Sequence, residues 1–306
     1  MSRAGYLAAS AAAILWAAGA TVAGRMFERG ASPLQLTAAR SWIGVLTLGA
    51  LILVVRRARA QPRRRAPFAH IVVFGAAIAA VNFSYYFAIS RLPVAIAIVI
   101  QYTAPGLVVL YAAVVERVRP SRRMMAALGL AFVGVALLAE VPSLIARGDL
   151  TLDGLGLIAA FGSAVSFTAY MLAGQALGAR VGPDGALLRG FMVASIIWIV
   201  ALSFGGRPDT LLDPSLTGQI LFVSIGATVA PFLLFLWGIG RVGASRAGIV
   251  STLEPLTAAL FAWIWLSQSL DPLQIAGGAM VVAGIAVVQS ERPRDQQMLV
   301  EAAAVE

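Results

Sequence analysis

The chain has 306 residues, of which 60% are hydrophobic and only 12% are charged, and its mean hydropathy is +0.87. A water-soluble domain carries about twice that share of charged residues, so the composition excludes one and indicates an integral membrane protein. No Cys is present, which excludes disulfides and thiol chemistry. The formal net charge is +9, all 23 basic residues being Arg. A nucleic-acid-binding surface would explain that charge, but the positions of the Arg residues, given below, exclude it.

Ten long apolar stretches follow one another along the chain. They begin near Gly5, Leu34, Phe68, Pro93, Met124, Gly154, Ala186, Leu216, Ala244 and Leu273. A helix needs about 20 such residues to cross the hydrocarbon core of a membrane. The first stretch has only Arg3 before it and no small-residue cleavage site after it, so we expect a retained span and not a signal peptide. The sequence therefore predicts an all-α integral membrane protein with ten transmembrane helices.

The chain also matches itself weakly at an offset of 150 residues. The matched pairs include Gly24 and Gly174, Pro33 and Pro183, Arg91 and Arg241, Pro105 and Pro255, and Gly134 and Gly284. Each half holds five spans, and an odd number forces the second half to enter the membrane in the opposite direction. We therefore expect two inverted five-helix repeats, at residues 1–150 and 151–290, followed by a disordered cytoplasmic tail at 291–306. Inverted repeats are typical of secondary transporters, whose substrate sites lie at mid-membrane between the repeats.

The Arg residues concentrate on one side of this topology. If the N-terminus lies inside, 17 of the 23 fall in inner loops or tails, five in outer loops, and Arg40 within the second span. Basic residues mark the cytoplasmic side of a membrane protein. Both termini are therefore expected in the cytoplasm, and the basic loops are expected to contact anionic lipids and not nucleic acid.

Two prolines are expected near the middle of their spans. Pro105 lies about 12 residues into the fourth span and Pro255 about 11 residues into the ninth, at a rise of 1.5 Å per residue. A proline removes one backbone donor and breaks the helix, and paired breaks in inverted repeats point to the transport pathway. We expect both to act as hinges, the alternative being a packing kink. Pro231 has no such partner, because Val81 stands at the matching position, and it is interpreted as a kink alone.

Two ionisable residues fall inside the spans. Glu254 precedes Pro255 at mid-depth, where a charge costs several kcal/mol unless it is paired or hydrated. Three roles fit it: a proton sensor, a partner for a substrate ammonium, or a protonated group in a helix-packing seam. Arg40 lies about seven residues into the second span, where it would hold a carboxylate, pair with Glu254 or extend outward to the interface. The last is the preferred interpretation.

Polar and aromatic residues at depth indicate a cavity. Asn82 and Tyr86 are four residues apart and share a helix face. Amides buried in lipid need partners or water, and rings at mid-span are not explained by interfacial belts. The predicted substrate-binding residues are Trp16, Asn82, Tyr85, Tyr86, Gln101, Tyr102, Tyr170, Trp237 and Glu254. They suit a small amphipathic solute with an aromatic or apolar part. Helix packing is the alternative explanation, and Trp237 also fits an interfacial belt.

Together these residues resemble a known family. The Trp16 stretch, Pro33 with Arg40, Pro105 with Glu116-Arg117, and Leu253-Glu254-Pro255 with Gly284 are similar to the two EamA repeats of the drug/metabolite transporter superfamily. Within that superfamily, the chain resembles the aromatic amino-acid exporter branch most. The resemblance implies ten helices around a central cavity, a bacterial inner-membrane location, and export of amino acids, aromatic or apolar ones in particular, or of related small metabolites, by alternating access. A proton-coupled exporter of cationic drugs is the alternative.

Other classes of protein fit less well. A membrane enzyme would need a nucleophile with a base or paired acids for a metal, and the chain has one His and one deep Glu. A channel would need rings of charge or carbonyls. We therefore expect no enzymatic activity, metal or cofactor, and as partners only a small-molecule substrate and membrane lipids, in a monomer or homodimer. One deep acid is compatible with proton antiport and with facilitated diffusion alike.

Overall fold

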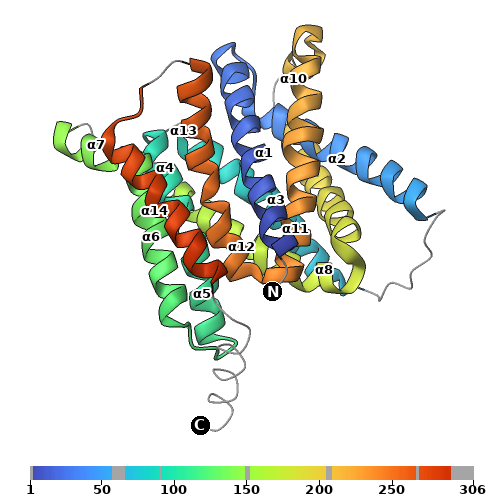
Figure 1. Ribbon diagram of the computed structural model, residues 1–306. Helices are drawn as coiled ribbons and strands as arrows, with labels where there is room; N and C mark the ends of the chain where they lie inside the picture. The colour runs from blue at the N-terminus through green and yellow to red at the C-terminus, as the bar shows by residue number, and fades with distance from the viewer. Residues whose placement is uncertain are drawn as a thin grey trace.

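The computed structural model describes residues 3–56, 66–89, 91–148, 152–204, 209–266 and 269–290 (Figure 1). Within these ranges the chain is a bundle of helices without a β-strand. The predicted tail at 291–306 and most of the basic loop that follows the second span lie outside the described residues. The fold class expected from the sequence, an all-α protein of apolar helices, is therefore confirmed.

The helices follow the predicted spans closely. The first half comprises α1 (Arg3–Glu28), α2 (Pro33–Arg56), α3 (Phe68–Ile89), α4 (Val94–Gln101), α5 (Ala104–Val114), α6 (Arg122–Leu138) and α7 (Val141–Arg147). The second half comprises α8 (Gly154–Ser203), α9 (Asp209–Leu212), the 3-10 turn η1 (Pro214–Leu216), α10 (Thr217–Leu221), the π-helix η2 (Phe222–Val229), α11 (Ala230–Val242), α12 (Ala244–Ser251), α13 (Leu253–Leu266) and α14 (Pro272–Gln289). Each predicted span begins within one helical turn of a helix start or, for the seventh, of a break inside α8.

The number of spans depends on how broken helices are divided. Among the described residues, seven helices are long and apolar enough to cross a membrane, and α6 with α7, bent by 50°, makes an eighth. Helix α8 is 50 residues long and is interrupted at Gly182, which has a φ of 78° and precedes Pro183. The parts before and after this break correspond to two predicted spans. Counting α12 with α13 as one broken span then gives ten. The count of ten spans stays a prediction, and the structure is compatible with it when the helices are divided in this way.

Short polar caps explain where several helices begin. Asp153 accepts a hydrogen bond from the Gly156 amide at the start of α8, and Ser121 accepts one from Met124 at the start of α6. At α14, Asp271 forms a full capping box with Gln274. Each cap satisfies a backbone N–H that the first helical turn leaves without a partner. Each of these helices therefore begins at a polar residue that directly precedes an apolar span.

The packing of the two halves follows a pseudo-twofold relation. Helix α1 packs on α11. At the offset of 150 residues, α1 corresponds to the first part of α8 and α11 corresponds to the end of α3. Helices α8 and α3 likewise pack on one another. Helices α6 and α14, the last long helix of each half, pack on one another. A side-chain carbon on Gly134 would lie 2.7 Å from the Gly277 carbonyl, and one on Gly284 would lie 2.9 Å from the Ala127 carbonyl. An offset of 150 residues converts the first contact into the second, so the seam itself obeys the repeat.

The bundle has two distinguishable ends. The start of α1 and the end of α14 lie together at one of them (Figure 1), where the Tyr6 hydroxyl donates to the Val288 carbonyl at 3.3 Å. We call this end the terminus face. At the other end, the opposite face, the Ser32 amide donates to Thr210 Oγ1 at 2.7 Å, and Arg91 pairs with Asp153 at 3.6 Å. Connections after odd-numbered spans therefore meet on the opposite face, as an alternating topology requires.

The glycine seam between α6 and α14 is testable. Gly134→Ala and Gly284→Ala should each lower the free energy of unfolding by about 1–3 kcal/mol, because the new methyl group meets backbone atoms that cannot yield. Unfolding of the purified protein in detergent, followed by tryptophan fluorescence, measures the change. Gly129→Ala is the matched control, since nothing lies within 4 Å of a side-chain carbon there. Equal stability of all three variants would contradict close packing at the seam.

Candidate functional site

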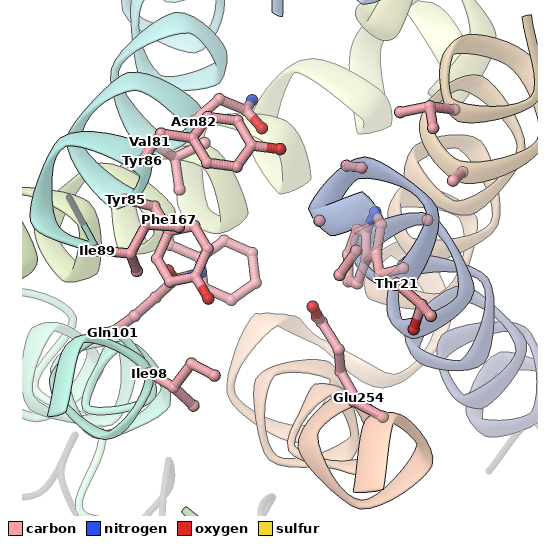
Figure 2. A pocket seen from close by; sticks show the side chains of 18 of the residues that line it. Thr21, Val81, Asn82, Tyr85, Tyr86, Ile89, Ile98, Gln101, Phe167 and Glu254 are labelled. Carbon is pink, nitrogen blue, oxygen red and sulfur yellow. The ribbon is translucent and has the colours of Figure 1, made fainter. Parts of the chain in front are cut away.

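A cavity of about 410 Å³ lies between the two repeats, lined by residues of α1, α2, α3, α4, α8, η2, α11 and α13. Its lining includes every predicted substrate-binding residue except Trp237, namely Trp16, Asn82, Tyr85, Tyr86, Gln101, Tyr102, Tyr170 and Glu254. Figure 2 shows Asn82 and Tyr86 projecting from one side and Glu254 pointing into the space from another. Polar and aromatic residues far apart in the sequence thus line the same cavity from different sides.

The cavity occupies only one half of the bundle. On α1 its lining runs from Trp16 to Phe27, and on α3 from Val81 to Ile89. Phe27 lies in the last turn of α1 and Ile89 ends α3, so the cavity reaches the opposite face. The portions of these helices that start at the terminus face contribute nothing to it. The cavity is therefore one-sided.

A cluster of aromatic rings closes the cavity toward the terminus face. This aromatic floor consists of Trp16, Phe74, Phe167, Tyr170, Phe232 and Phe235. Tyr170 stacks on Phe74 with ring centroids 5.4 Å apart, and both side chains are fully buried. Trp16 meets Phe235 edge-on at 5.0 Å. Within the described chain, the Trp16 indole N–H and the Tyr170 hydroxyl have no hydrogen-bond partner. The floor is thus apolar packing with two unsatisfied polar atoms.

Arg40 does not extend to the interface, contrary to the preferred expectation. It is only 8% exposed, and its Nε donates to Thr228 Oγ1 at 2.6 Å. Its Nη1 donates to Asn82 Oδ1 at 3.3 Å and to the Tyr86 hydroxyl at 3.2 Å. Asn82 is oriented by its own amide N–H group, which donates to the Ile78 carbonyl. Three neutral side chains from two segments, α3 and η2, therefore hold a guanidinium inside the bundle, which removes the reason for it to extend outward.

The π-helix η2 supplies the nearest of these partners. Pro231 has no N–H to bond the carbonyl one turn earlier, and η2 occupies the eight residues that precede α11. The Thr228 hydroxyl donates to the Val223 carbonyl at 2.7 Å, five residues back, and accepts from Arg40. π-helical turns are frequent at functional sites. Pro231, interpreted as a kink alone, thus adjoins the turn that carries the partner of Arg40.

Glu254 is held on the other side of the cavity. The Tyr102 hydroxyl lies 2.8 Å from Glu254 Oε2 and 3.2 Å from the Ser251 carbonyl. A hydroxyl has one proton to donate, so Tyr102 donates to the carboxylate when Glu254 is ionised. When Glu254 is protonated, Tyr102 accepts from it and donates to the Ser251 carbonyl. Both charge states therefore keep the hydrogen bond between Tyr102 and Glu254 Oε2, while Oε1 has no donor among the described residues.

The two predicted helix breaks occur where the prolines indicated. Helix α4 ends at Gln101 and α5 begins at Ala104, while α12 ends at Ser251 and α13 begins at Leu253. Pro255 lines the cavity, whereas Pro105 lies outside its lining and packs against Gly248. The breaks thus bring Tyr102 and Glu254 to the cavity, and a hinge role for the prolines stays a prediction.

Trp237 lies outside the cavity. It is near the end of α11, and the Arg241 guanidinium carbon sits 3.1 Å above its ring centroid. This placement agrees with the interfacial explanation of Trp237 and not with substrate contact. Conversely, sequence reasoning missed Thr228, Phe167 and Phe232. A Phe within an apolar span gives no signal that separates a cavity wall from a lipid-facing surface.

Comparison with known proteins decides the family. The model of the EamA-like transporter family matches residues 3–139 and 154–290, one match in each half of the chain. The chain belongs to the EamA-like transporter family. It is therefore a membrane transporter of small molecules and not an enzyme. The resemblance drawn from the sequence is confirmed at the level of the family.

Curated relatives and a solved structure agree with this assignment. The threonine/homoserine exporter RhtA of Escherichia coli (strain K12) is 29% identical over 276 residues, which cover 87% of this chain and 85% of the relative. The uncharacterized transporter YwfM of Bacillus subtilis (strain 168) is 30% identical over 154 residues, about half of each chain. One crystal structure shares the fold with a TM-score of 0.77 at 21% identity, over 93% of this chain and 96% of that one.

The bond between Arg40 and Thr228 is testable. Thr228→Val keeps the side-chain shape but leaves the buried Arg40 Nε–H without an acceptor, which should cost about 1–3 kcal/mol of stability. Thermal unfolding in detergent checks this. Thr21→Val, a control in the same cavity wall whose hydroxyl donates only within its own helix, should change little. A silent Thr228→Val would show that the bond does not anchor Arg40.

Proposed function

We propose that this EamA-like transporter exports amino acids across the bacterial inner membrane by alternating access, with the side chain of the substrate against the aromatic floor. The observation that carries the proposal is the one-sided cavity, whose mostly apolar walls carry Arg40, Glu254 and several neutral polar side chains and whose base is closed by rings. Its volume and apolar floor suit a small amphipathic solute with an apolar or aromatic part. The name of the relative RhtA, a threonine/homoserine exporter, supports the amino-acid class.

The distribution of Arg supports the orientation of the cavity. Arg123 approaches Ser290 at the end of α14, and a side chain on Gly5 would meet Arg241. Both Arg residues therefore lie on the terminus face. Both also belong to the 17 Arg residues that the sequence assigns to inner loops or tails. Because basic residues mark the cytoplasmic side, we place both termini inside. The cavity then faces outward, in the state that would release an exported solute.

Alternation is supported by a difference between equivalent positions. A side-chain carbon on Gly174 would lie 2.6 Å from Leu236 and 2.9 Å from Phe74, whereas nothing lies within 4 Å of one on Gly24, which lines the cavity. These glycines are 150 residues apart and occupy matching places in α8 and α1. In an inward-open state the pseudo-twofold relation exchanges them, so that Gly24 becomes packed and Gly174 opens. Pro105 and Pro255 are the proposed hinges of this exchange.

Export of cationic drugs is the alternative function. A carboxylate at Glu254 and a ring-lined cavity would attract an aromatic cation. Arg40 in the same cavity repels it, and for that reason we favour amino acids. Among the described residues that line the cavity, Glu254 is the one with a carboxylic acid side chain. We therefore assign any proton coupling to Glu254. Since the described residues place no second acid and no His in the cavity lining beside it, we favour uncoupled transport.

Transport by purified protein in liposomes tests the function. We expect saturable counterflow of L-phenylalanine or L-threonine, in which preloaded unlabelled amino acid drives accumulation of the labelled one. An imposed pH gradient should have little effect on the initial rate. Counterflow of an aromatic dication without any amino-acid counterflow would replace this proposal by the drug-export alternative.

Bulky residues at the two glycines should trap opposite states. Because the chain has no native Cys, a single Ala20→Cys change in the cavity wall reports access of an impermeant thiol reagent from outside. Adding Gly174→Leu should slow labelling about tenfold, since the overpacked inner side opens and the outer side closes. Adding Gly24→Leu should leave labelling fast while transport is lost. Gly178→Leu, where nothing lies within 4 Å, is the control, and equal labelling of all variants would contradict the exchange.

A further inference from the structure

Two opposite charges line the same cavity without touching. Arg40 comes from α2 and Glu254 from α13, and both belong to the lining. Among the described residues, neither group forms an ion pair, with the other or with a third residue. A charge at this depth is unfavourable unless it is compensated. The empty cavity therefore holds two charges at separate positions, each in need of a partner of opposite sign.

The Arg40 guanidinium has donors to spare. Its Nε and Nη1 are bound by Thr228, Asn82 and Tyr86, which are neutral. Its Nη2 carries two further N–H groups and has no acceptor among the described residues. The three neutral partners fix the plane of the guanidinium while leaving its charge free. A planar fork held in this way is the arrangement that proteins use to bind a carboxylate.

The Glu254 carboxylate is arranged in the complementary way. Its Oε2 accepts from the Tyr102 hydroxyl, and its Oε1 has no donor in the described chain. Figure 2 shows the carboxylate pointing into the cavity, across from the side chains of α3 that hold Arg40. An ammonium group is the donor of opposite charge that such a site accepts. The bond from Tyr102 keeps the carboxylate in position when the cavity is empty.

We propose that Arg40 binds the α-carboxylate and Glu254 the α-ammonium of an amino-acid zwitterion, so that the cavity reads the two charges of its substrate separately. This inference rests on the proposed function and names the residues that recognise the substrate class. A zwitterion has no net charge, and neither has the pair of Arg40 and Glu254. A dication would meet Arg40 and a dianion would meet Glu254, so each is rejected by a like charge. The side chain is left to the aromatic floor, where Trp16 and Phe232 contact it.

Substrate analogues that lack one charge test the assignment. The probes are L-threonine, L-threoninamide, which lacks the carboxylate, and N-acetyl-L-threonine, which lacks the ammonium. Each is measured as a competitor of amino-acid counterflow in liposomes. In the wild-type protein we expect both analogues to bind at least about tenfold more weakly than L-threonine, since each loses a charge-assisted hydrogen bond.

Two variants should each remove one discrimination. Arg40→Gln should weaken L-threonine about tenfold but leave L-threoninamide unchanged, so that the preference for a carboxylate disappears. Glu254→Gln should likewise abolish the preference for an ammonium over its acetylated form. Arg91→Gln and Glu140→Gln are the matched controls, because both residues lie at exposed helix ends outside the cavity. Arg40→Lys, which keeps the charge but loses the fork, should retain part of the preference and serves if Arg40→Gln does not fold.

The outcomes separate this inference from the function on which it rests. If Arg40→Gln prefers L-threonine over its amide as strongly as the wild type does, Arg40 does not bind the carboxylate. If Glu254→Gln retains the preference over N-acetyl-L-threonine, Glu254 does not bind the ammonium. Amino-acid counterflow by the wild type with either result overturns the zwitterion assignment alone. Failure of the wild type to transport any amino acid overturns the proposed function and this inference together.

Discussion

A guanidinium inside the hydrocarbon region is costly unless its N–H groups are bound, and the walls of the cavity are arranged around this constraint at Arg40. Its partners come from α3 and from the π-helix η2, which are separated by about half of the chain. Asn82 is oriented through Ile78 and Thr228 through Val223. The polar network thus ties the first repeat to the second inside the bundle. A change at any member affects the position of Arg40, which is why shape-conserving variants such as Thr228→Val are informative.

Much of this arrangement follows from local signals in the sequence. The spans follow from hydropathy, and the interrupted helices at Pro105 and Pro255 follow from the missing backbone donor. Asn82, Tyr86 and Gln101 were recognisable because polar groups at such depth need partners. The burial of Arg40 was not recognisable, because its distance from the helix end allows it to reach water. Arg40 is instead held inside the bundle by Thr228, which lies 188 residues away in the sequence. Thr228 belongs to a π-helical turn that no sequence pattern predicts. Likewise, the floor rings Phe167 and Phe232 look like any other Phe in an apolar span.

The two repeats share a fold but differ in chemistry at equivalent positions. Asn82, Tyr85 and Tyr86 in α3 correspond, at the offset of 150, to Phe232, Phe235 and Leu236 in α11. All three residues of the first set line the cavity, whereas in the second set only Phe232, in the aromatic floor, borders it, and Phe235 and Leu236 are buried in the closed half. An inward-open state built by exchanging the repeats would therefore offer a less polar vestibule on the terminus face. The aromatic floor belongs to both halves, and the unsatisfied hydroxyl of Tyr170 within it would gain water when that side opens.

The contact between Gly134 and Gly277, repeated by Gly284 and Ala127, has a consequence for how the charges of the cavity are distributed. Two separate copies of one repeat, paired through the same seam, would form the same antiparallel bundle, but every side chain would then occur twice. Such a dimer would carry two guanidiniums or two carboxylates at related positions, and each pair would repel. In the joined chain, Gly190 stands at the position equivalent to Arg40 and Ala104 at the position equivalent to Glu254. Covalent linkage of the halves thus allows a polarised interior, with one cation and one anion, inside a framework that remains symmetric in its backbone.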